Sequence, residues 1–395
     1  MQVYLDNSAT TRQYDEVTET MLVYMREDFG NPSSLYRPGI RAEKAVRGAR
    51  RELARAFSCQ EEEIFFTSGG TESDNTAIFG AAASGKRQGN RIITTNVEHP
   101  AVLEAMKRLE DEGFDIVRIS VNGDGGVSAE TIFEAVNEKT ILISVMQVNN
   151  ETGMVMPVSE IAAMKEQYNR EHGTKILFHT DAVQAFGKMK VLAPGVDLVS
   201  VSAHKIHGPK GIGALYMRKG VKIRPYIVGG GQEHHFRSGT ENVPAIAGFG
   251  TACGLAYDHL SERIAHMTET RDYLLKGIEA EISDIRINSV REGTESGEAG
   301  LCCPSVLNIS FLGTRGEVIL HTLEQDGIYV STGSACSSNK KGRSPVLTAM
   351  GLSDKEIEGA IRFSFSEENT KEEMDFVLSK LKDAVLRFRK LGSFR

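Results

Sequence analysis

The sequence predicts an α/β protein built on a doubly wound and mostly parallel sheet, followed by a smaller α+β domain. Two observations support this fold class. Short apolar runs alternate with helical patterns along the first two thirds of the chain, and the alternation ends after about Gly254. Strands that alternate with helices form parallel sheets covered on both faces. Ligands of such sheets bind beyond the carboxyl ends of the strands, so the residues there are the first candidates for a site.

The predicted elements follow one another in a regular order. Strands, each a short apolar run, are expected at 92–95, 116–119, 140–145, 176–179, 198–201 and 213–217. The helices between several of them are expected at about 101–112, 129–137 and 158–172. Beyond the change of pattern, we expect a long helix at about 256–280, strands at 306–311 and 361–365, and a last helix at about 371–389.

Composition narrows the class of protein further. The chain has 395 residues, 40% apolar and 25% charged, which is ordinary for a globular protein large enough to place a site between domains. No apolar run approaches the ~20 residues that a membrane-spanning helix needs. The N-terminus lacks the pattern of a signal peptide, so we expect a cytoplasmic protein that binds no membrane. The net charge of -7 is spread along the chain, which argues against direct binding of nucleic acid.

A glycine pair follows a short apolar strand that begins at Ile64. Gly69 and Gly70 allow backbone N–H groups to approach an anion closely, and Thr71 can cap the following helix and offer a hydroxyl. A helix N-terminus of this kind is a ready phosphate site. Taken alone, the motif is more typical of an ordinary capped helix after a tight turn.

Polar residues end two further core strands. Ser202, His204 and Lys205 follow the strand at 198–201, where burial lowers the pKa of a lysine and an amine can bond covalently to a cofactor aldehyde. Asp181 follows the strand at 176–179 and could pair with a pyridinium nitrogen. The alternatives are a surface lysine at a strand exit and an aspartate that caps the next helix.

One cysteine lies in a run of small polar residues. Cys336 stands in the segment 331–342, which ends in two lysines and is followed by Arg343. We expect an exposed loop, in which nearby cations lower the pKa of the thiol. The other cysteines, Cys59, Cys253, Cys302 and Cys303, bring the number to five, which fits a reducing compartment rather than a disulfide framework. Cys302 and Cys303 could be redox-active or bind a metal, but a structural role is the simpler interpretation.

Together, and in this order, these segments resemble the pyridoxal-phosphate (PLP) dependent cysteine desulfurases of the NifS/IscS type, within the class V aminotransferases. The likeness also covers the segments 4–11, 29–34, 98–101, 148–153, 237–242 and 360–364. It implies an aspartate aminotransferase-like fold with a mostly parallel seven-stranded sheet. The large PLP-binding domain would be residues 12–255. Residues 1–11 and 256–395 would form the small α+β domain with the catalytic cysteine loop.

The resemblance implies a role for individual residues. Lys205 would hold PLP and carry the α-proton, with His99 stacked on the ring to assist proton transfer. Asp181 would bond the pyridine nitrogen and Gln184 the phenolic oxygen. The phosphate would be held by Gly70, Thr71, Ser202 and His204, and by Thr240 of the partner subunit, which makes a homodimer necessary.

The resemblance also implies a substrate and an activity. Asn150, which also borders the cofactor, and Arg362 would bind the carboxylate of L-cysteine. Cys336 would take the sulfur as a persulfide, leave L-alanine, and pass the sulfur to an acceptor, either an iron–sulfur scaffold or a tRNA-thiolation enzyme. No resident metal is implied, although Cys336 could be a transient iron–sulfur ligand. The chain stops soon after its last helix, which favours a NifS-like member over an IscS-type member with a longer tail.

Other functions fit parts of the same pattern. A selenocysteine lyase or another PLP aminotransferase would share the fold, because fold alone does not separate such activities. A non-catalytic sulfur-assembly scaffold could also keep the fold, but the joint presence of Lys205, His99, Asp181, Arg362 and Cys336 argues against it. A metalloprotein built on Cys302, Cys303 and a nearby histidine is the least favoured alternative.

Overall fold

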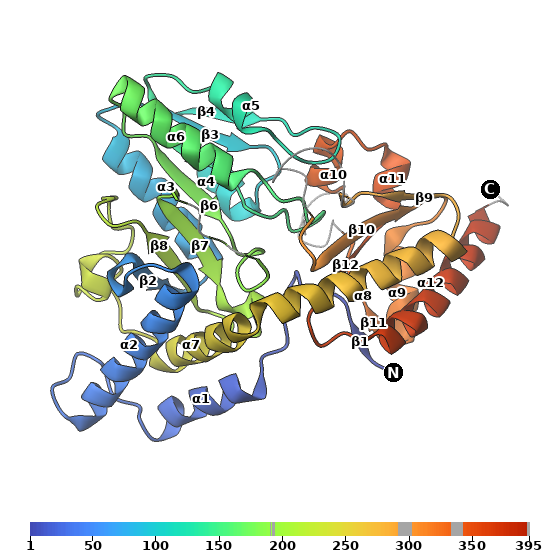
Figure 1. Ribbon diagram of the computed structural model, residues 1–395, viewed down its shortest axis with the longest axis horizontal. Helices are drawn as coiled ribbons and strands as arrows, with labels where there is room; N and C mark the ends of the chain where they lie inside the picture. The colour runs from blue at the N-terminus through green and yellow to red at the C-terminus, as the bar shows by residue number, and fades with distance from the viewer. Residues whose placement is uncertain (190, 192–193, 291–301, 333–342, 393–395) are drawn as a thin grey trace.

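The structure is a computed structural model that describes every residue except 190, 192–193, 291–301, 333–342 and 393–395 (Figure 1). Its largest sheet has seven strands in the order β2-β8-β7-β6-β5-β3-β4. Strands β7, β6, β5, β3 and β4 are parallel, whereas β8 is antiparallel to both β7 and β2. The predicted mostly parallel seven-stranded sheet is therefore confirmed. The strands are β2 (Ile64–Thr67), β3 (Arg91–Thr95), β4 (Asp115–Ile119), β5 (Thr140–Ser144), β6 (Leu177–Asp181), β7 (Leu198–Ser202) and β8 (Gly213–Met217).

Both faces of this sheet are covered. Successive strand residues point to opposite faces, and neighbours such as Phe65 and Phe66, or Leu198 and Val199, belong to two different core clusters. Helix α3 packs against α4 and against β5, β7 and β8, while α7 packs against α1 and α2. The helices of this part are α1 (Asp15–Arg26), α2 (Arg37–Phe57), α3 (Gly70–Gly85), α4 (Pro100–Asp111), α5 (Ala129–Glu134), α6 (Val158–His172) and α7 (Val243–Asp258).

The C-terminal part has its own sheets and its own apolar core. Strands β9 (Ile285–Ile287) and β12 (Ala360–Ser364) flank β10 (Val306–Phe311) in an antiparallel sheet, and β1 (Val3–Tyr4) pairs with β11 (Ile328–Tyr329) beside it (Figure 1). A separate cluster unites apolar side chains of β1, β10 and β12 with those of α8 and α12. The start of the chain therefore packs with its end, while the domain boundaries expected after residues 11 and 255 stay a prediction. The remaining helices are α8 (Leu260–Glu281), α9 (Gly316–Gln325), α10 (Pro345–Ala349), α11 (Asp354–Glu358) and α12 (Lys371–Gly392).

Two predicted helices have different bounds in the structure. The helix expected at 256–280 begins only at Leu260, because His259 has non-helical dihedrals and separates it from α7. The helix expected at 129–137 ends at Glu134. Within the described residues, no helix combines the length and apolar character needed to cross a membrane.

A buried ion pair holds β6 and β7, the strands that end in Asp181 and Ser202. The carboxylate of Asp197 accepts hydrogen bonds of 2.8 Å from the Lys165 ammonium and from the backbone N–H of Phe178. The side chains of Lys165 and Asp197 are both 0% exposed, so neither charge is solvated by bulk water. Each therefore depends on its protein partners.

Asp197→Ala should destabilise the fold by roughly 3–5 kcal/mol, because it leaves the Lys165 ammonium buried without its main counter-charge. Urea unfolding measures the change. Glu166→Gln is the matched control, since that side chain also contacts Lys165 but is 33% exposed, and it should cost less than about 1 kcal/mol. Equal effects of the two substitutions would contradict this account.

Candidate active site at the carboxyl ends of the strands

The glycine pair after β2 forms a cradle against two other strand ends. A Cβ atom on Gly70 would lie 2.8 Å from Val183 Cγ2, and one on Gly69 would lie 4.0 Å from Ser202 Oγ. Larger residues would fill this space. The N-cap of α3 is Gly69, with a φ of 150° and no side-chain cap, so the prediction that Thr71 caps the helix is wrong. Thr71 is exposed in the first turn, where its hydroxyl and the helix N-terminus can face an anion.

Lys205 follows β7 in a short 3-10 turn, η2 (Ala203–Lys205), as the sequence predicts. Its side chain is half-buried, and its Nζ donates to the carbonyl oxygens of Ser8 at 2.5 Å and Ala9 at 2.8 Å. The Ser8 carbonyl also accepts a 2.9 Å hydrogen bond from Gln184 Nε2. The Ser8 carbonyl oxygen thus binds both the amine of Lys205 and the amide of Gln184.

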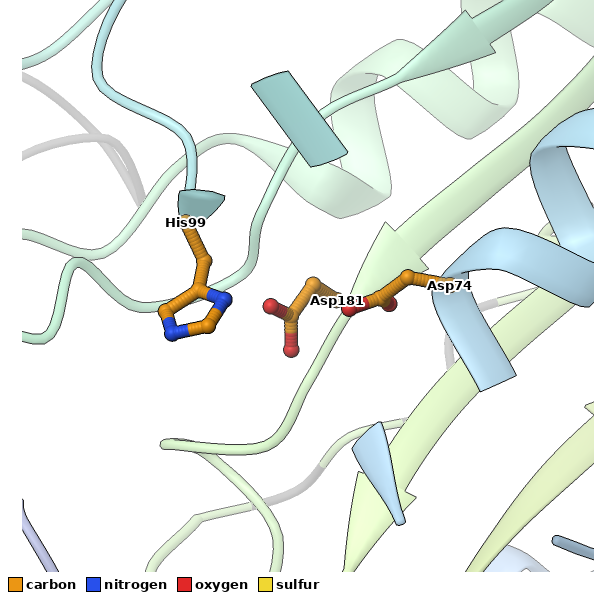
Figure 2. Close-up of side chains that lie close together, drawn as sticks. All are labelled: Asp74, His99 and Asp181. Atoms are coloured by element: carbon orange, nitrogen blue, oxygen red, sulfur yellow. The ribbon is translucent and has the colours of Figure 1, made fainter. Parts of the chain in front are cut away.

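Asp181 lies between His99 and Asp74 (Figure 2). One potential ligand atom from each of the three side chains lies within 4.8 Å of the others. Burial raises the pKa of Asp181 to about 6 and lowers the pKa of His99. His99 caps α4 by accepting a 3.2 Å hydrogen bond from Ala101 N at Nδ1. The Nδ1 atom of His99 is thus already an acceptor within its own helix.

Two further buried acids adjoin Asp181. Burial raises the pKa of Asp74 to about 7, although a hydrogen bond with Ser200 opposes the shift. Burial likewise raises the pKa of Glu98 to about 8, against hydrogen bonds from Met146 N and Thr95. Neither acid was singled out from the sequence. Asp74 belongs to the segment 64–75, which contains the glycine pair. It lies three residues after Thr71, one helical turn further along α3, and this spacing is the signal that could have identified it.

His179 connects Asp74 to the sheet. Its Nδ1 lies 2.8 Å from Ser144 Oγ, and its Nε2 lies 3.0 Å from Ser200 Oγ and 3.5 Å from Asp74 Oδ1. Burial lowers the pKa of His179 to about 4, so the ring is neutral at neutral pH. Burial therefore favours the neutral forms of Asp74, Glu98 and His179, the groups next to Asp181.

Arg362 joins the predicted substrate residues across two parts of the fold. Its guanidinium donates to the Asn150 carbonyl at 2.9 Å and to Asp6 Oδ1 at 2.6 Å. Its Nε is buried and has no hydrogen-bond partner among the residues that the structure describes. An arginine held in this way can offer its remaining edge to a carboxylate. The same edge of the site also includes Glu151, which accepts a 2.5 Å hydrogen bond from Ser344 Oγ.

The remaining predicted site residues lie in different settings. His204 is half-buried, with Nδ1 3.2 Å from Thr10 Oγ1, and burial lowers its pKa to about 4. Thr240 is exposed on the loop before α7. Cys336 lies outside the described residues, between Thr332 and Arg343. The structure therefore brings the cradle, Lys205, Asp181, His99 and Gln184 to one edge of the sheet, whereas it leaves the position of Cys336 undefined.

Cys302 and Cys303 have structural surroundings. Cys303 is 0% exposed, and its Sγ lies 3.3 Å from Ser305 Oγ. Burial raises the pKa of Cys302 to about 12, and its Sγ faces the carbonyl oxygens of Cys303 and Val306. These contacts fit the structural interpretation of the pair.

The site fits PLP in three respects. The glycine cradle and Ser202 suit a phosphate, Lys205 offers an amine, and the buried Asp181 carboxylate suits a protonated ring nitrogen. The uncapped N-terminus of α3 and the space that a Cβ atom would fill at Gly70 are the observations that support the phosphate position.

Comparisons with known proteins agree with this arrangement. The aminotransferase class-V family model matches residues 3–377. Cysteine desulfurase IscS of Clostridium botulinum (strain Hall) is 43% identical over 393 residues, which covers 99% of this chain and 96% of that protein. Cysteine desulfurase IscS of Dictyoglomus turgidum is 42% identical over 396 residues, 100% of this chain and 97% of that protein.

Solved structures are similar as well. A NifS-like protein superposes with a TM-score of 0.88 at 40% identity, covering 98% of this chain and 100% of that one. SspA in complex with cysteine gives a TM-score of 0.79 at 33% identity, covering 93% of this chain and 99% of that one. Both IscS and NifS names occur among the similar proteins, so the preference for a NifS-like member stays a prediction.

Asp74→Asn should gain stability relative to the native chain as pH rises. The pKa of Asp74 is raised from 3.8 to about 7, so folding favours the protonated carboxyl, and this contribution is lost as pH rises from about 4 through about 7. Asparagine has no proton to lose, so the relative gain should reach roughly 2–4 kcal/mol. Urea unfolding of the cofactor-free protein between pH 4.5 and pH 8 measures it.

Asp124→Asn, at an exposed turn, is the control for that experiment. Its difference from the native chain should stay constant across the same pH range. A constant difference for Asp74→Asn as well would show that the buried acid does not titrate as described.

Proposed function

The chain belongs to the class-V aminotransferase family, and we propose that it is a PLP-dependent cysteine desulfurase, converting L-cysteine to L-alanine and transferring the sulfur through Cys336. The observation that carries the proposal is the convergence of Lys205 and Asp181 with the glycine cradle at one sheet edge. Relatives named cysteine desulfurase, at 42–43% identity over nearly the whole chain, support the reaction. The similar structure of SspA with bound cysteine supports the substrate.

When bound, PLP supplies an aldehyde that condenses with amines and a ring that withdraws electrons from the substrate Cα. In this proposal, Gly70, Thr71, Ser202 and His204 bind its phosphate, Asp181 holds a proton on the ring nitrogen, and Gln184 donates to the phenolic oxygen. His99 would lie beside the ring, and burial lowers the pKa of its imidazole.

Lys205 moves the substrate proton. The Ser8 and Ala9 carbonyls hold its Nζ in place, from which it takes the proton from the substrate Cα as a general base. Arg362 binds the substrate carboxylate beside Asn150. The ion pair with Asp6 fixes the guanidinium before the substrate arrives, which lowers the cost of ordering it.

Cys336 completes the reaction. Its thiolate attacks the substrate sulfur, an S–S bond forms as the Cβ–S bond breaks, and the electron pair stays on the carbon that is protonated to become the methyl group of alanine. Burial raises the pKa of Cys59 and Cys302 to about 12 each, so these two thiols are poor alternatives.

Covalent geometry supports a role for Cys336 near the substrate. Ser331 exchanges both backbone hydrogen bonds with Arg362, at 3.1 and 2.7 Å, and Ser344 is bound to Glu151 next to Asn150. The segment that contains Cys336 is therefore attached at both ends beside the predicted substrate residues.

The proposed partners follow from the same chemistry. A homodimer would place Thr240 of the partner subunit on the phosphate, and the exposure of this threonine supports such a contact. The sulfur acceptor would be an iron–sulfur scaffold or a tRNA-thiolation enzyme. A cytoplasmic location fits these acceptors and the presence of reduced cysteines.

Cys336→Ala should lower both persulfide and alanine formation from cysteine by at least about a hundredfold, because the nucleophile is lost. The visible absorbance of bound PLP should persist. Cys59→Ala is the control and should leave turnover unchanged. Full alanine production by Cys336→Ala would refute the assignment, and equal saturating turnover of selenocysteine by the native enzyme would favour a selenocysteine lyase.

Borohydride treatment of the native protein should fix the cofactor on the peptide that contains Lys205. Mass spectrometry of the digest locates the adduct, and Lys205→Ala should show none while losing desulfurase activity. The exposed neighbour Lys210 provides the control Lys210→Ala, which should behave as the native protein does. An adduct on any other lysine, or a colourless native protein, would contradict a PLP enzyme built on Lys205.

A further inference from the structure

Three consecutive residues adopt a left-handed backbone in the loop before α7. Glu233, His234 and His235, in η3 (Glu233–His235), have φ angles of 47°, 57° and 65°. Residues with a Cβ atom avoid this region, and a run of three is unfavourable at each step. Such a turn persists only where the surrounding structure holds it, and strain of this kind is concentrated at functional sites.

A buried ion pair holds this turn. The Glu233 carboxylate, 6% exposed, accepts hydrogen bonds from Arg50 at 2.9 and 2.7 Å and from the backbone N–H of Phe66 at 2.9 Å. The Arg50 guanidinium also lies 4.8 Å from the centre of the Phe66 ring and donates to the Ile64 carbonyl. The bidentate guanidinium of Arg50 therefore fixes the orientation of the Glu233 carboxylate and balances its charge.

The rest of the loop is attached at its base and exposed at its end. Arg237 forms two hydrogen bonds with Glu72 in the first turn of α3, at 2.7 and 3.1 Å. Gly239 N donates to Gln232 Oε1 at 2.9 Å, which closes the loop across the left-handed turn. Thr240 follows immediately and is exposed. The anchors thus determine where Thr240 is presented, away from the interior of its own subunit.

We propose that Glu233 is a positioning residue that acts across the subunit interface, by holding the left-handed turn that presents Thr240 to the cofactor phosphate of the partner subunit. This inference rests on the proposed function. The competing account is an effect within one subunit, because Glu233 also binds the backbone of β2, which leads into that subunit's own Gly69 and Gly70.

Hybrid dimers separate the two accounts, because Lys205→Ala inactivates one chosen active site. In the same-subunit hybrid, Glu233→Gln is on the subunit that keeps Lys205, and its partner carries Lys205→Ala. In the cross-subunit hybrid, both substitutions are on one subunit and its partner is native. The reference hybrid pairs a native subunit with one that carries Lys205→Ala alone. Two different affinity tags allow each hybrid to be purified.

The cross-subunit hybrid should bind PLP about tenfold more weakly than the reference, as expected for loss of one hydrogen bond to a charged phosphate. The same-subunit hybrid should stay within about twofold of the reference. Titration of PLP into the cofactor-depleted hybrids, with cysteine turnover as a second readout, measures both. A loss confined to the same-subunit hybrid, an equal loss in both, or no loss in either would overturn the inference.

Three controls complete the test. Glu62→Gln removes an exposed carboxylate from the same groove as Glu233 and should have no effect in the cross-subunit hybrid. Adding Glu233→Gln to Thr240→Ala in that hybrid should cause no further loss, because both changes remove the same contact; additive losses would overturn the inference. An inactive reference hybrid would instead refute the proposed function, and the inference with it.

A second substitution covers the case in which Glu233→Gln does not fold. Arg50→Lys keeps the positive charge but removes the two-pronged contact with Glu233. Placed in the same two hybrids, Arg50→Lys should weaken PLP binding in the cross-subunit hybrid alone. A loss in the same-subunit hybrid would overturn the inference.

Discussion

The burial of the Asp181 carboxyl group at the end of β6 is the constraint on which the rest of the site depends. A carboxylate in a dry site is costly unless a positive charge lies beside it. Here the adjoining groups do not provide one: Asp74 and Glu98 are buried acids with raised pKa values, and His179 is a neutral ring. The raised pKa values show that burial favours the neutral forms of these acids. In the proposed function, a protonated ring nitrogen would lie beside Asp181 and favour its charged form.

The first residues of the chain join the two halves of this chemistry. Asp6 pairs with Arg362, Asn7 donates to the Ser364 carbonyl at 2.9 Å, and the carbonyls of Ser8 and Ala9 bind Lys205. The same short segment therefore contacts the group that would bind the substrate carboxylate and the amine that would take the substrate proton. A displacement of this segment would change its distances to Arg362 and to Lys205 together. The pairing of β1 with β11 holds the start of the chain in place and so supports the candidate site as well as the fold.

Site residues that follow a strand could be predicted from local chemistry. The glycine pair, Asp181 and Lys205 each follow an apolar run, so a parallel sheet must bring them to one edge. Contacts that depend on long-range burial could not be predicted in this way. Nothing local distinguishes the Ser8 carbonyl, which meets Lys205 at a separation of 197 residues. Asp74 is marked only by its spacing of one helical turn from Thr71, and this spacing does not reveal its burial. Thr71 is the capping candidate by residue type, but the N-cap is Gly69, whose φ of 150° favours glycine. Single motifs thus locate the site, whereas the pKa values of its buried groups can be predicted only from the packing of the whole fold.

Burial also decides which cysteines can take part in the sulfur chemistry. A thiol accepts sulfur only as a thiolate that the substrate can reach. Burial raises the pKa of Cys253 far above its ordinary value, and it raises the pKa of Cys59 and Cys302 to about 12. Cys303 is enclosed in the core and paired with a hydroxyl. Each cysteine within the described residues is therefore protected from reaction by the fold itself. The proposed sulfur acceptor, Cys336, belongs to the segment whose flanking residues Ser331 and Ser344 are bonded to Arg362 and Glu151. The burial of the other four cysteines would favour reaction at this one.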